Sequence, residues 1–183
     1  MSVRVVVVED HPVTRMGVVA LLGQDERIEV VGEAGAGEDA LEVVARERPD
    51  VVVTDLRLGD GLDGVGVTSA VRGTRPAPAV LVLTTYDTDR DIVRAVEAGA
   101  AGYLLKDADP ARITDAVIRA AAGGTVLSPD LAQRVVAEPV GVAHLRGLGG
   151  VKCREGGGVT RCGDGVEGIA TVEIVGLVSV ALW

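Results

Sequence analysis

Phenylalanine is absent from this sequence of 183 residues, and aromatic residues make up only 2% of it. A core must therefore be built from Val, Leu, Ile and Ala, which supply most of the 48% of residues that are hydrophobic. So few aromatic rings argue against a platform on which the bases of single-stranded nucleic acid could stack. The length allows one ordinary domain and a small second one, at roughly 100–200 residues per domain.

Positive charge is also scarce, because 18 Lys and Arg residues stand against 27 Asp and Glu residues and give a formal net charge of −9. This balance argues against broad electrostatic capture of DNA by the whole molecule. The N-terminal residues have no secretory signal pattern, and no apolar run reaches the roughly 20 uncharged residues of a membrane span. We therefore expect a cytoplasmic protein that does not bind the membrane.

Cysteine is rare, and the only two residues, Cys153 and Cys162, are spaced too widely for a C-x-x-C motif. A metal site would need a second pair of ligands, which the sequence does not offer nearby. Two free thiols are therefore the expected state, with a disulfide or a metal site as the alternatives.

Apolar runs alternate with segments of helical periodicity in the first 122 residues. The runs are typical of buried strands and lie at residues 3–8, 28–31, 51–54, 79–84 and 102–105. Helices are predicted at residues 12–22, 37–45, 65–71, 88–98 and 110–121. Parallel strands need crossover connections, and runs without polar alternation need cover on both faces. The sequence therefore predicts an α/β protein with a doubly wound, five-stranded parallel sheet and helices on both faces.

Polar side chains follow four of these predicted strands. They are Glu9 and Asp10, Asp55, Thr84 and Thr85, and Lys106. Each alone has an ordinary explanation, because a strand commonly ends in a polar residue as it leaves the core. In open α/β sheets, however, ligands bind beyond the carboxyl ends of the strands, and the flavodoxin-like order 2-1-3-4-5 puts the third strand between the first and the fourth. Since neighbouring strands lie about 4.8 Å apart, Asp55 is expected at the centre of a polar cluster.

The carboxylates of Glu9, Asp10 and Asp55 would repel one another by about 4 kcal/mol per pair at roughly 4 Å in an effective dielectric near 20. Lys106 supplies one compensating charge. A Mg²⁺ ion would supply two more, because this hard cation binds one or two carboxylates together with water and phosphate. A carboxylate neutralised in this way can act as a nucleophile toward phosphorus. Asp55 is therefore the predicted phospho-acceptor, and Mg²⁺ is the predicted cofactor.

These residues, with EDHP at 9–12 and GAAGYLLKD at 99–107, resemble the receiver domain of two-component response regulators of the NarL/FixJ subclass. The resemblance extends over residues 1–137 and implies the CheY-like form of the flavodoxin-like fold. It also implies that a sensor histidine kinase phosphorylates Asp55 and that Lys106 holds the phosphate. Such a protein is a signalling phospho-acceptor that assists its own phosphorylation and dephosphorylation, and is not expected to be an enzyme with a separate substrate.

The same resemblance implies a set of metal ligands and a switch. The implied Mg²⁺ ligands are Asp10, Asp55 and the backbone carbonyl of Arg57, with Glu9 acting through water. Thr84 and Tyr103 would be the switch pair that reshapes the surface around the fourth helix, fifth strand and fifth helix. The alternatives are an ordinary hydroxyl at a strand end for Thr84 and a packed core aromatic for Tyr103. Dimerisation on phosphorylation is a further expectation.

Two other chemistries are disfavoured by spacing. The stretch GEAGAG at residues 32–37 does not have the G-x-G-x-x-G spacing, and no GK[ST] follows it, which argues against nucleotide binding. Phosphohydrolases with an aspartyl nucleophile typically have a second carboxylate two residues later, where this sequence has Arg57.

The resemblance ends after Glu138, where members of the subclass usually carry a helix-turn-helix with a basic recognition helix. Residues 141–183 hold 11 of the 25 glycines, with four basic and four acidic residues, so they have neither the helical pattern nor the positive balance. The expected organisation is a receiver domain at 1–122, a linker at 123–140 with room for a short helix, and a glycine-rich, irregular and poorly ordered tail. Within the tail, residues 168–183 are strand-like.

One hypothesis for this tail is that it is a degenerate or out-of-frame remnant of a helix-turn-helix domain. Translating the gene in its other frames tests the idea, and the absence of a helix-turn-helix pattern there would refute it. Two functions remain open. One is a transcription regulator that binds DNA if an output domain is intact, and the other is a stand-alone receiver that acts through protein contacts as a phosphate sink or adaptor.

Overall fold

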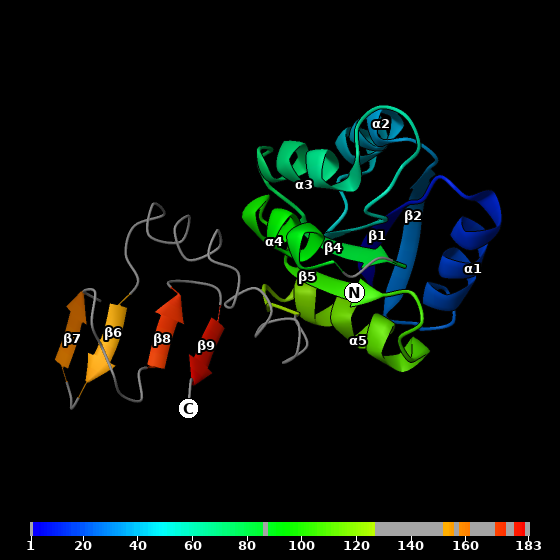
Figure 1. The fold of residues 1–183 in the computed structure, drawn as a ribbon. Coiled ribbons are helices and arrows are strands. Elements are labelled where there is room, and N and C mark those ends of the chain that lie inside the picture. Colours follow the sequence, from blue (N-terminus) through cyan, green and yellow to red (C-terminus); the bar gives the residue numbers. More distant parts are fainter. Residues whose placement is uncertain are drawn as a thin grey trace. The chain divides into compact units, whose positions relative to one another are not determined.

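The computed structural model describes residues 2–85 and 88–126 and four short strands nearer the C-terminus. The chain divides into two compact units, Met1–Ala132 and Gln133–Trp183. In the first unit, strands and helices alternate along the chain (Figure 1). Their bounds are β1 Val3–Val8, α1 Pro12–Leu22, β2 Ile28–Ala34, α2 Gly37–Glu47, β3 Val51–Thr54, α3 Gly64–Arg72, β4 Ala79–Thr84, α4 Asp89–Glu97, β5 Gly102–Leu105 and α5 Pro110–Ala121.

The five strands form one parallel sheet in the order β2-β1-β3-β4-β5, which confirms the predicted fold class and strand order. Val8 of β1 pairs with Thr54 of β3. Thr84 of β4 pairs with Leu105 of β5. The residues that follow these pairs therefore leave the sheet at the same edge, which is the edge where the sequence predicted a site.

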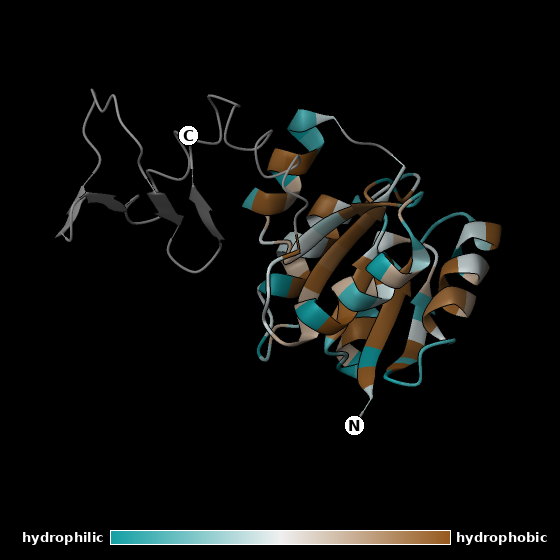
Figure 2. Cartoon of the chain, turned by 90° about the horizontal axis from the view of Figure 1, so that it is seen from below, coloured by the Kyte–Doolittle hydropathy of each residue, from teal (hydrophilic) through white to brown (hydrophobic). Residues whose placement is uncertain are grey.

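Alternate side chains of the strands pack into two separate cores. Val5 and Val7 contribute to the core beneath α1 and α5. Val6 and Val8 contribute to the core beneath α2 and α3. Successive side chains of a strand point to opposite faces, so an uninterrupted apolar run suits a sheet that is covered on both sides. Figure 2 shows the hydrophobic strands lying between the helices.

Strand β2 is longer than predicted, because the prediction ended it at residue 31, before Gly32 and Glu33. In the structure β2 continues to Ala34. A Cβ atom at Gly32 would lie only 2.6 Å from a methyl group of Val43 in α2, so the glycine allows this helix to pack closely on the strand. The break in the apolar run at Gly32 is thus a packing feature within a continuous strand.

The predicted helix boundaries agree with the structure to within two residues. Thr88 caps α4, because its side chain accepts a hydrogen bond from the backbone N–H of Asp91. Asp109 caps α5, with Pro110 in the first turn. Gly99 follows α4 with φ of +93°, a left-handed conformation that favours glycine.

In the second unit, the structure describes four short strands that pair antiparallel in the order β7-β6-β8-β9. They are β6 Lys152–Glu155, β7 Gly158–Arg161, β8 Thr171–Ile174 and β9 Val178–Ala181. Strands β8 and β9 lie within residues 168–183, which the sequence predicts to be strand-like, whereas β6 and β7 lie in the part of the tail that was expected to be irregular. Three of the four strands contain the β-branched residues that favour pleated backbone. The other residues of the predicted tail, residues 127–140 of the predicted linker and both thiol groups lie outside what the structure describes.

The predicted linker begins beside the sheet. Val126 forms a parallel bridge with Gly102 and accepts a hydrogen bond from the backbone N–H of Tyr103, with an N–O distance of 3.0 Å. Across the part of the chain that the structure describes, no helix combines the length and the apolar character that a membrane crossing requires.

Candidate functional site

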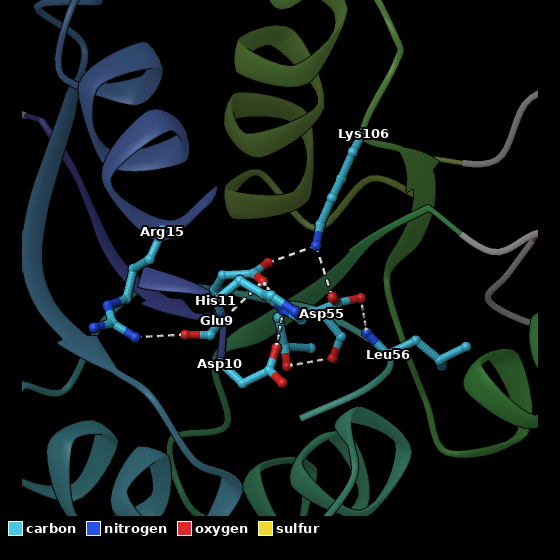
Figure 3. A network of polar contacts seen from close by, with 8 residues as sticks. Glu9, Asp10, His11, Arg15, Asp55, Leu56 and Lys106 are labelled. Carbon is cyan, nitrogen blue, oxygen red and sulfur yellow. Dashed lines mark hydrogen bonds and ion pairs between the residues drawn. The ribbon is translucent and has the colours of Figure 1, made fainter. Parts of the chain in front are cut away.

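Three predicted site residues meet at the carboxyl edge of the sheet (Figure 3). The Lys106 Nζ atom lies 2.6 Å from Asp55 Oδ2 and also 2.6 Å from Glu9 Oε2. Glu9 and Asp55 are buried, with only 2% and 6% of their surface exposed. The strand ends therefore converge as predicted, and the lysine crosses from β5 to reach carboxylates that follow β1 and β3.

The orientation of Asp55 is fixed by its neighbours. Its backbone N–H donates to the carbonyl of Val8, which continues the pairing of β1 with β3 beyond the strand end. Its Oδ1 atom accepts a hydrogen bond of 2.6 Å from the backbone N–H of Leu56. The side chain thus has one oxygen on the backbone and the other on Lys106, and it is held at the edge where a reacting group could approach.

Lys106 is held by the same strand pairing. Its backbone N–H donates to the carbonyl of Thr84 at 2.8 Å, which sets the start of the side chain at the end of β5. Burial alone would lower the pKa of Lys106, but the hydrogen bonds and negative charges of Asp55 and Glu9 outweigh this effect, so the pKa of Lys106 is raised. The ammonium group remains charged at neutral pH and offsets the repulsion between the two acids.

Replacement Lys106→Met is expected to lower the free energy of unfolding by about 3 kcal/mol at pH 7 without divalent cations, because it leaves two buried carboxylates without their counter-charge. Urea unfolding measures the change. The double variant Lys106→Met with Glu9→Gln should recover part of the loss, since it removes one of the two charges. A single variant as stable as the native chain would show that the ammonium does not offset the acids.

Asp10 and His11 extend the cluster away from Lys106. The His11 Nδ1 atom lies 2.9 Å from Asp10 Oδ1, and one ligand atom from each of Glu9, Asp10 and His11 fits within 4.8 Å. The second carboxylate oxygen of Asp10, Oδ2, lies beside Gly59. A Cβ atom added at Gly59 would stand 3.6 Å from this oxygen, which is an ordinary van der Waals contact. Carboxylate oxygens of this kind are hard donors, so the residues present suit a hard divalent cation such as Mg²⁺.

The remaining predicted residues lie around this cluster. Arg57 follows Asp55 by two residues, and its guanidinium extends to Asp91 of α4 with an Nη2–Oδ2 distance of 3.8 Å. Thr84 and Tyr103 are fully buried in neighbouring strands β4 and β5. The metal-ligand role of the Arg57 carbonyl and the switch roles of Thr84 and Tyr103 stay predictions.

Two contributors to the site escaped the sequence analysis. Arg15 of α1 donates from Nη1 to the backbone carbonyl of Glu9 at 2.6 Å. Gly64, the first residue of α3, lies so close to the loop after β3 that a Cβ atom there would collide with the backbone of Asp55. The sequence signal for Arg15 is its position one helical turn after His11, whereas Gly64 is one of several glycines in its segment.

The family that matches this chain matches it within the first compact unit. Residues 5–118 match the response regulator receiver domain family. This match covers more than half of the chain, so the protein belongs to that family.

Two curated relatives come from Mycobacterium tuberculosis. One is described as "Probable transcriptional regulatory protein NarL" (strain CDC 1551 / Oshkosh), and it is 42% identical over 130 residues, which cover 71% of this chain and 60% of the relative. The other is described as "DNA-binding transcriptional activator DevR/DosR" (strain H37Rv), and it is 39% identical over 142 residues, which cover 78% of this chain and 65% of the relative. The chain thus matches less than two thirds of the length of these two proteins.

A solved structure agrees with the fold. The two-component response regulator of the LuxR family from Aurantimonas sp. SI85-9A1 superposes with a TM-score of 0.70 and 34% identity, over 76% of this chain and 99% of that one. The chain is therefore a response regulator receiver protein whose relatives include transcriptional regulators of two-component systems.

Proposed function

We propose that Asp55 accepts a phosphoryl group from a sensor histidine kinase, with Mg²⁺ held by Asp10, Asp55 and the backbone carbonyl of Arg57 and with Glu9 acting through water. The observation that carries this proposal is the position of Lys106 Nζ, at 2.6 Å from both Asp55 Oδ2 and Glu9 Oε2. The ammonium offsets one of the two buried negative charges and stands where it can contact an incoming phosphoryl group. When bound, Mg²⁺ supplies positive charge that offsets the negative oxygens of that group.

In the proposed transfer, a carboxylate oxygen of Asp55 attacks phosphorus and forms an acyl phosphate. The bond between phosphorus and the imidazole nitrogen of the kinase breaks, and its electron pair stays on that nitrogen. Lys106 can move with the reacting oxygens, because its flexible stem already spans the space between two strands. Positioning and charge neutralisation supply most of the catalysis in reactions of this class. The chain assists the transfer to itself and has no separate substrate.

The transferred group supports a switch through Thr84 and Tyr103. It adds roughly −1.5 to −2 charge and three acceptor oxygens at the carboxyl edge of the sheet. We propose that the Thr84 hydroxyl turns to the phosphoryl group and that the ring of Tyr103 follows. Both residues are fully buried in adjacent strands of a closely packed core. A movement of one side chain therefore requires the other to move. The surface around α4, β5 and α5 is the expected readout.

The output proposed for the whole protein is control of transcription in the cytoplasm. It is favoured by the names of the two curated relatives, one a transcriptional regulatory protein and one a DNA-binding transcriptional activator. DNA binding requires an intact output domain, and phosphorylation-linked dimerisation would present two such domains to one site. The alternative, a stand-alone receiver that acts as a phosphate sink or adaptor, is less favoured by these names. A DNA titration with and without phosphorylation separates the two, because salt-sensitive binding supports the regulator.

The phospho-acceptor function is tested by incubating the full chain with a small phosphodonor such as acetyl phosphate, with either Mg²⁺ or a chelator. We expect one phosphoryl group per chain with Mg²⁺ and little without it, measured by intact mass spectrometry. Labelling to the same extent in both conditions would contradict the proposed role of the metal.

Replacement Asp10→Asn is expected to abolish the rise in melting temperature that Mg²⁺ gives the native chain. A ligand that binds only the folded state stabilises it by about 2.7 kcal/mol at 100 times its dissociation constant, so loss of a charged ligand atom is visible in a thermal scan. Asp107→Asn serves as the control, because it removes an exposed acid that follows Lys106 directly in the sequence. Equal Mg²⁺ stabilisation of Asp10→Asn and the native chain would exclude Asp10 as a ligand.

A further inference from the structure

Arg15 links three parts of the site region that are separate in the sequence. Its Nη1 atom donates to the backbone carbonyl of Glu9 at 2.6 Å, and its Nε atom lies 3.5 Å from Glu33 Oε2 on β2. The side chain starts from α1 and is largely buried, with 23% of its surface exposed. Figure 3 shows the guanidinium directed at the Glu9 carbonyl, on the opposite side of that residue from Lys106.

The surroundings of this guanidinium leave room for it. A Cβ atom at Gly35 would lie 3.0 Å from Arg15 Nη1, which is closer than ordinary side-chain contacts. Glycine at this position therefore allows the arginine to occupy the space between α1 and the end of β2. The fork of an arginine can serve a carbonyl and a carboxylate at the same time, which a lysine ammonium does with less geometric definition.

The contact fixes the peptide that joins Glu9 to Asp10. The N–H of Glu9 donates to the carbonyl of Ala34 at 3.0 Å, and the carbonyl of Glu9 accepts from Arg15. Both polar backbone groups of Glu9 are thus held by neighbouring elements. Since the backbone sets the direction of each side chain, this arrangement directs Glu9 to Lys106 and leaves Asp10 beside His11.

We propose that Arg15 is a positioning residue that presets the two acids after β1 for a divalent cation. It does not touch the metal, and it acts by holding the backbone from which both carboxylates extend. Groups that orient metal ligands typically contribute about 10–100-fold to metal affinity. The inference rests on the proposed Mg²⁺ site.

The test compares three full-length variants with the native chain, namely Arg15→Met, Arg15→Lys and Arg4→Met. Arg4 is the matched control, because it also donates to a backbone carbonyl (Glu47 O, 2.9 Å) and pairs with a carboxylate, but it stands near the start of β1, at the opposite edge of the sheet. The first readout is the Mg²⁺ concentration that half-saturates the folded chain, obtained by fitting the rise of the melting temperature with Mg²⁺ concentration. The second is the phosphorylation rate by acetyl phosphate at limiting and at saturating Mg²⁺.

For Arg15→Met we expect the half-saturating Mg²⁺ concentration to rise about tenfold, with the rate at saturating Mg²⁺ within about threefold of native. Arg15→Lys should recover part of the affinity, since an ammonium can still donate to the Glu9 carbonyl. Arg4→Met should lower the melting temperature without moving the half-saturation point. A merely structural arginine would behave like Arg4.

Two outcomes would overturn this inference alone, and a third would overturn it together with the proposed function. If the native chain binds Mg²⁺ and Arg15→Met keeps the native half-saturation, Arg15 does not position the acids. If Arg15→Met and Arg4→Met shift the half-saturation equally, the effect is general destabilisation. If the native chain itself shows no response to Mg²⁺, the proposed metal site fails, and this inference fails with it.

Discussion

We expect the Asp55→Asn variant to incorporate no phosphoryl group from acetyl phosphate at any Mg²⁺ concentration. An amide is not a nucleophile toward phosphorus, so the loss is complete and not a change in rate. The variant should keep the fold, because the amide oxygen can still accept the hydrogen bond from the Leu56 N–H. Loss of one of the charges that crowd the carboxyl edge also lowers the repulsion there.

The matched control for this experiment is Asp60→Asn. Asp60 is an exposed acid in the same loop between β3 and α3, and its replacement changes the net charge by the same amount. It should label like the native chain in intact mass spectrometry. Incorporation into Asp55→Asn at the native level would place the acceptor elsewhere and refute the proposed site.

Gly64→Ala is expected to have the second largest effect on the phosphorylation rate, because Gly64 packs the start of α3 directly against the backbone of Asp55. The added methyl group would collide with the Asp55 carbonyl oxygen and stand 2.9 Å from its carbonyl carbon, so one of the two segments has to move. Overpacking of this kind costs about 1–3 kcal/mol of stability. A shift of roughly 1 Å at the acceptor lowers the phosphorylation rate by about 100-fold.

Gly17→Ala is a control that should raise the free energy of unfolding, whereas Gly64→Ala should lower it. Gly17 lies inside α1, and a Cβ atom there has no other group within 4 Å. Replacement of an exposed glycine within a helix by alanine stabilises a protein by about 0.5–1 kcal/mol. Urea unfolding and phosphorylation assays should therefore separate the two variants. A Gly64→Ala chain with native stability and native rate would show that the two backbone segments do not constrain each other.

The sequence contained enough information to predict the sheet and the meeting of Glu9, Asp55 and Lys106. Buried parallel strands are apolar on both faces, so their ends are marked by the first charged residue. The flavodoxin-like order, which is one of the common orders of doubly wound sheets, then fixes which strand ends are neighbours. The 2.6 Å contacts of Lys106 with both acids agree with that prediction.

Other features depend on contacts that a local pattern does not contain. The reach of Arg15 to the Glu9 carbonyl depends on the angle between α1 and β1 and on the space left at Gly35. The continuation of β2 through Gly32 depends on how closely α2 approaches it. In the second unit, β8 and β9 lie within the strand-like run at 168–183, whereas β6 and β7 lie among the glycines and no apolar run marks them.

The most direct test of the proposed chemistry is to identify the residue that carries the phosphoryl group. Phosphorylated chain is treated with borohydride, which reduces an acyl phosphate to an alcohol, and the peptides are sequenced by mass spectrometry. We predict homoserine at position 55 in the Mg²⁺-treated native chain and nowhere else. Homoserine at position 10 or 60, with an unmodified Asp55, would contradict the assignment of the phospho-acceptor.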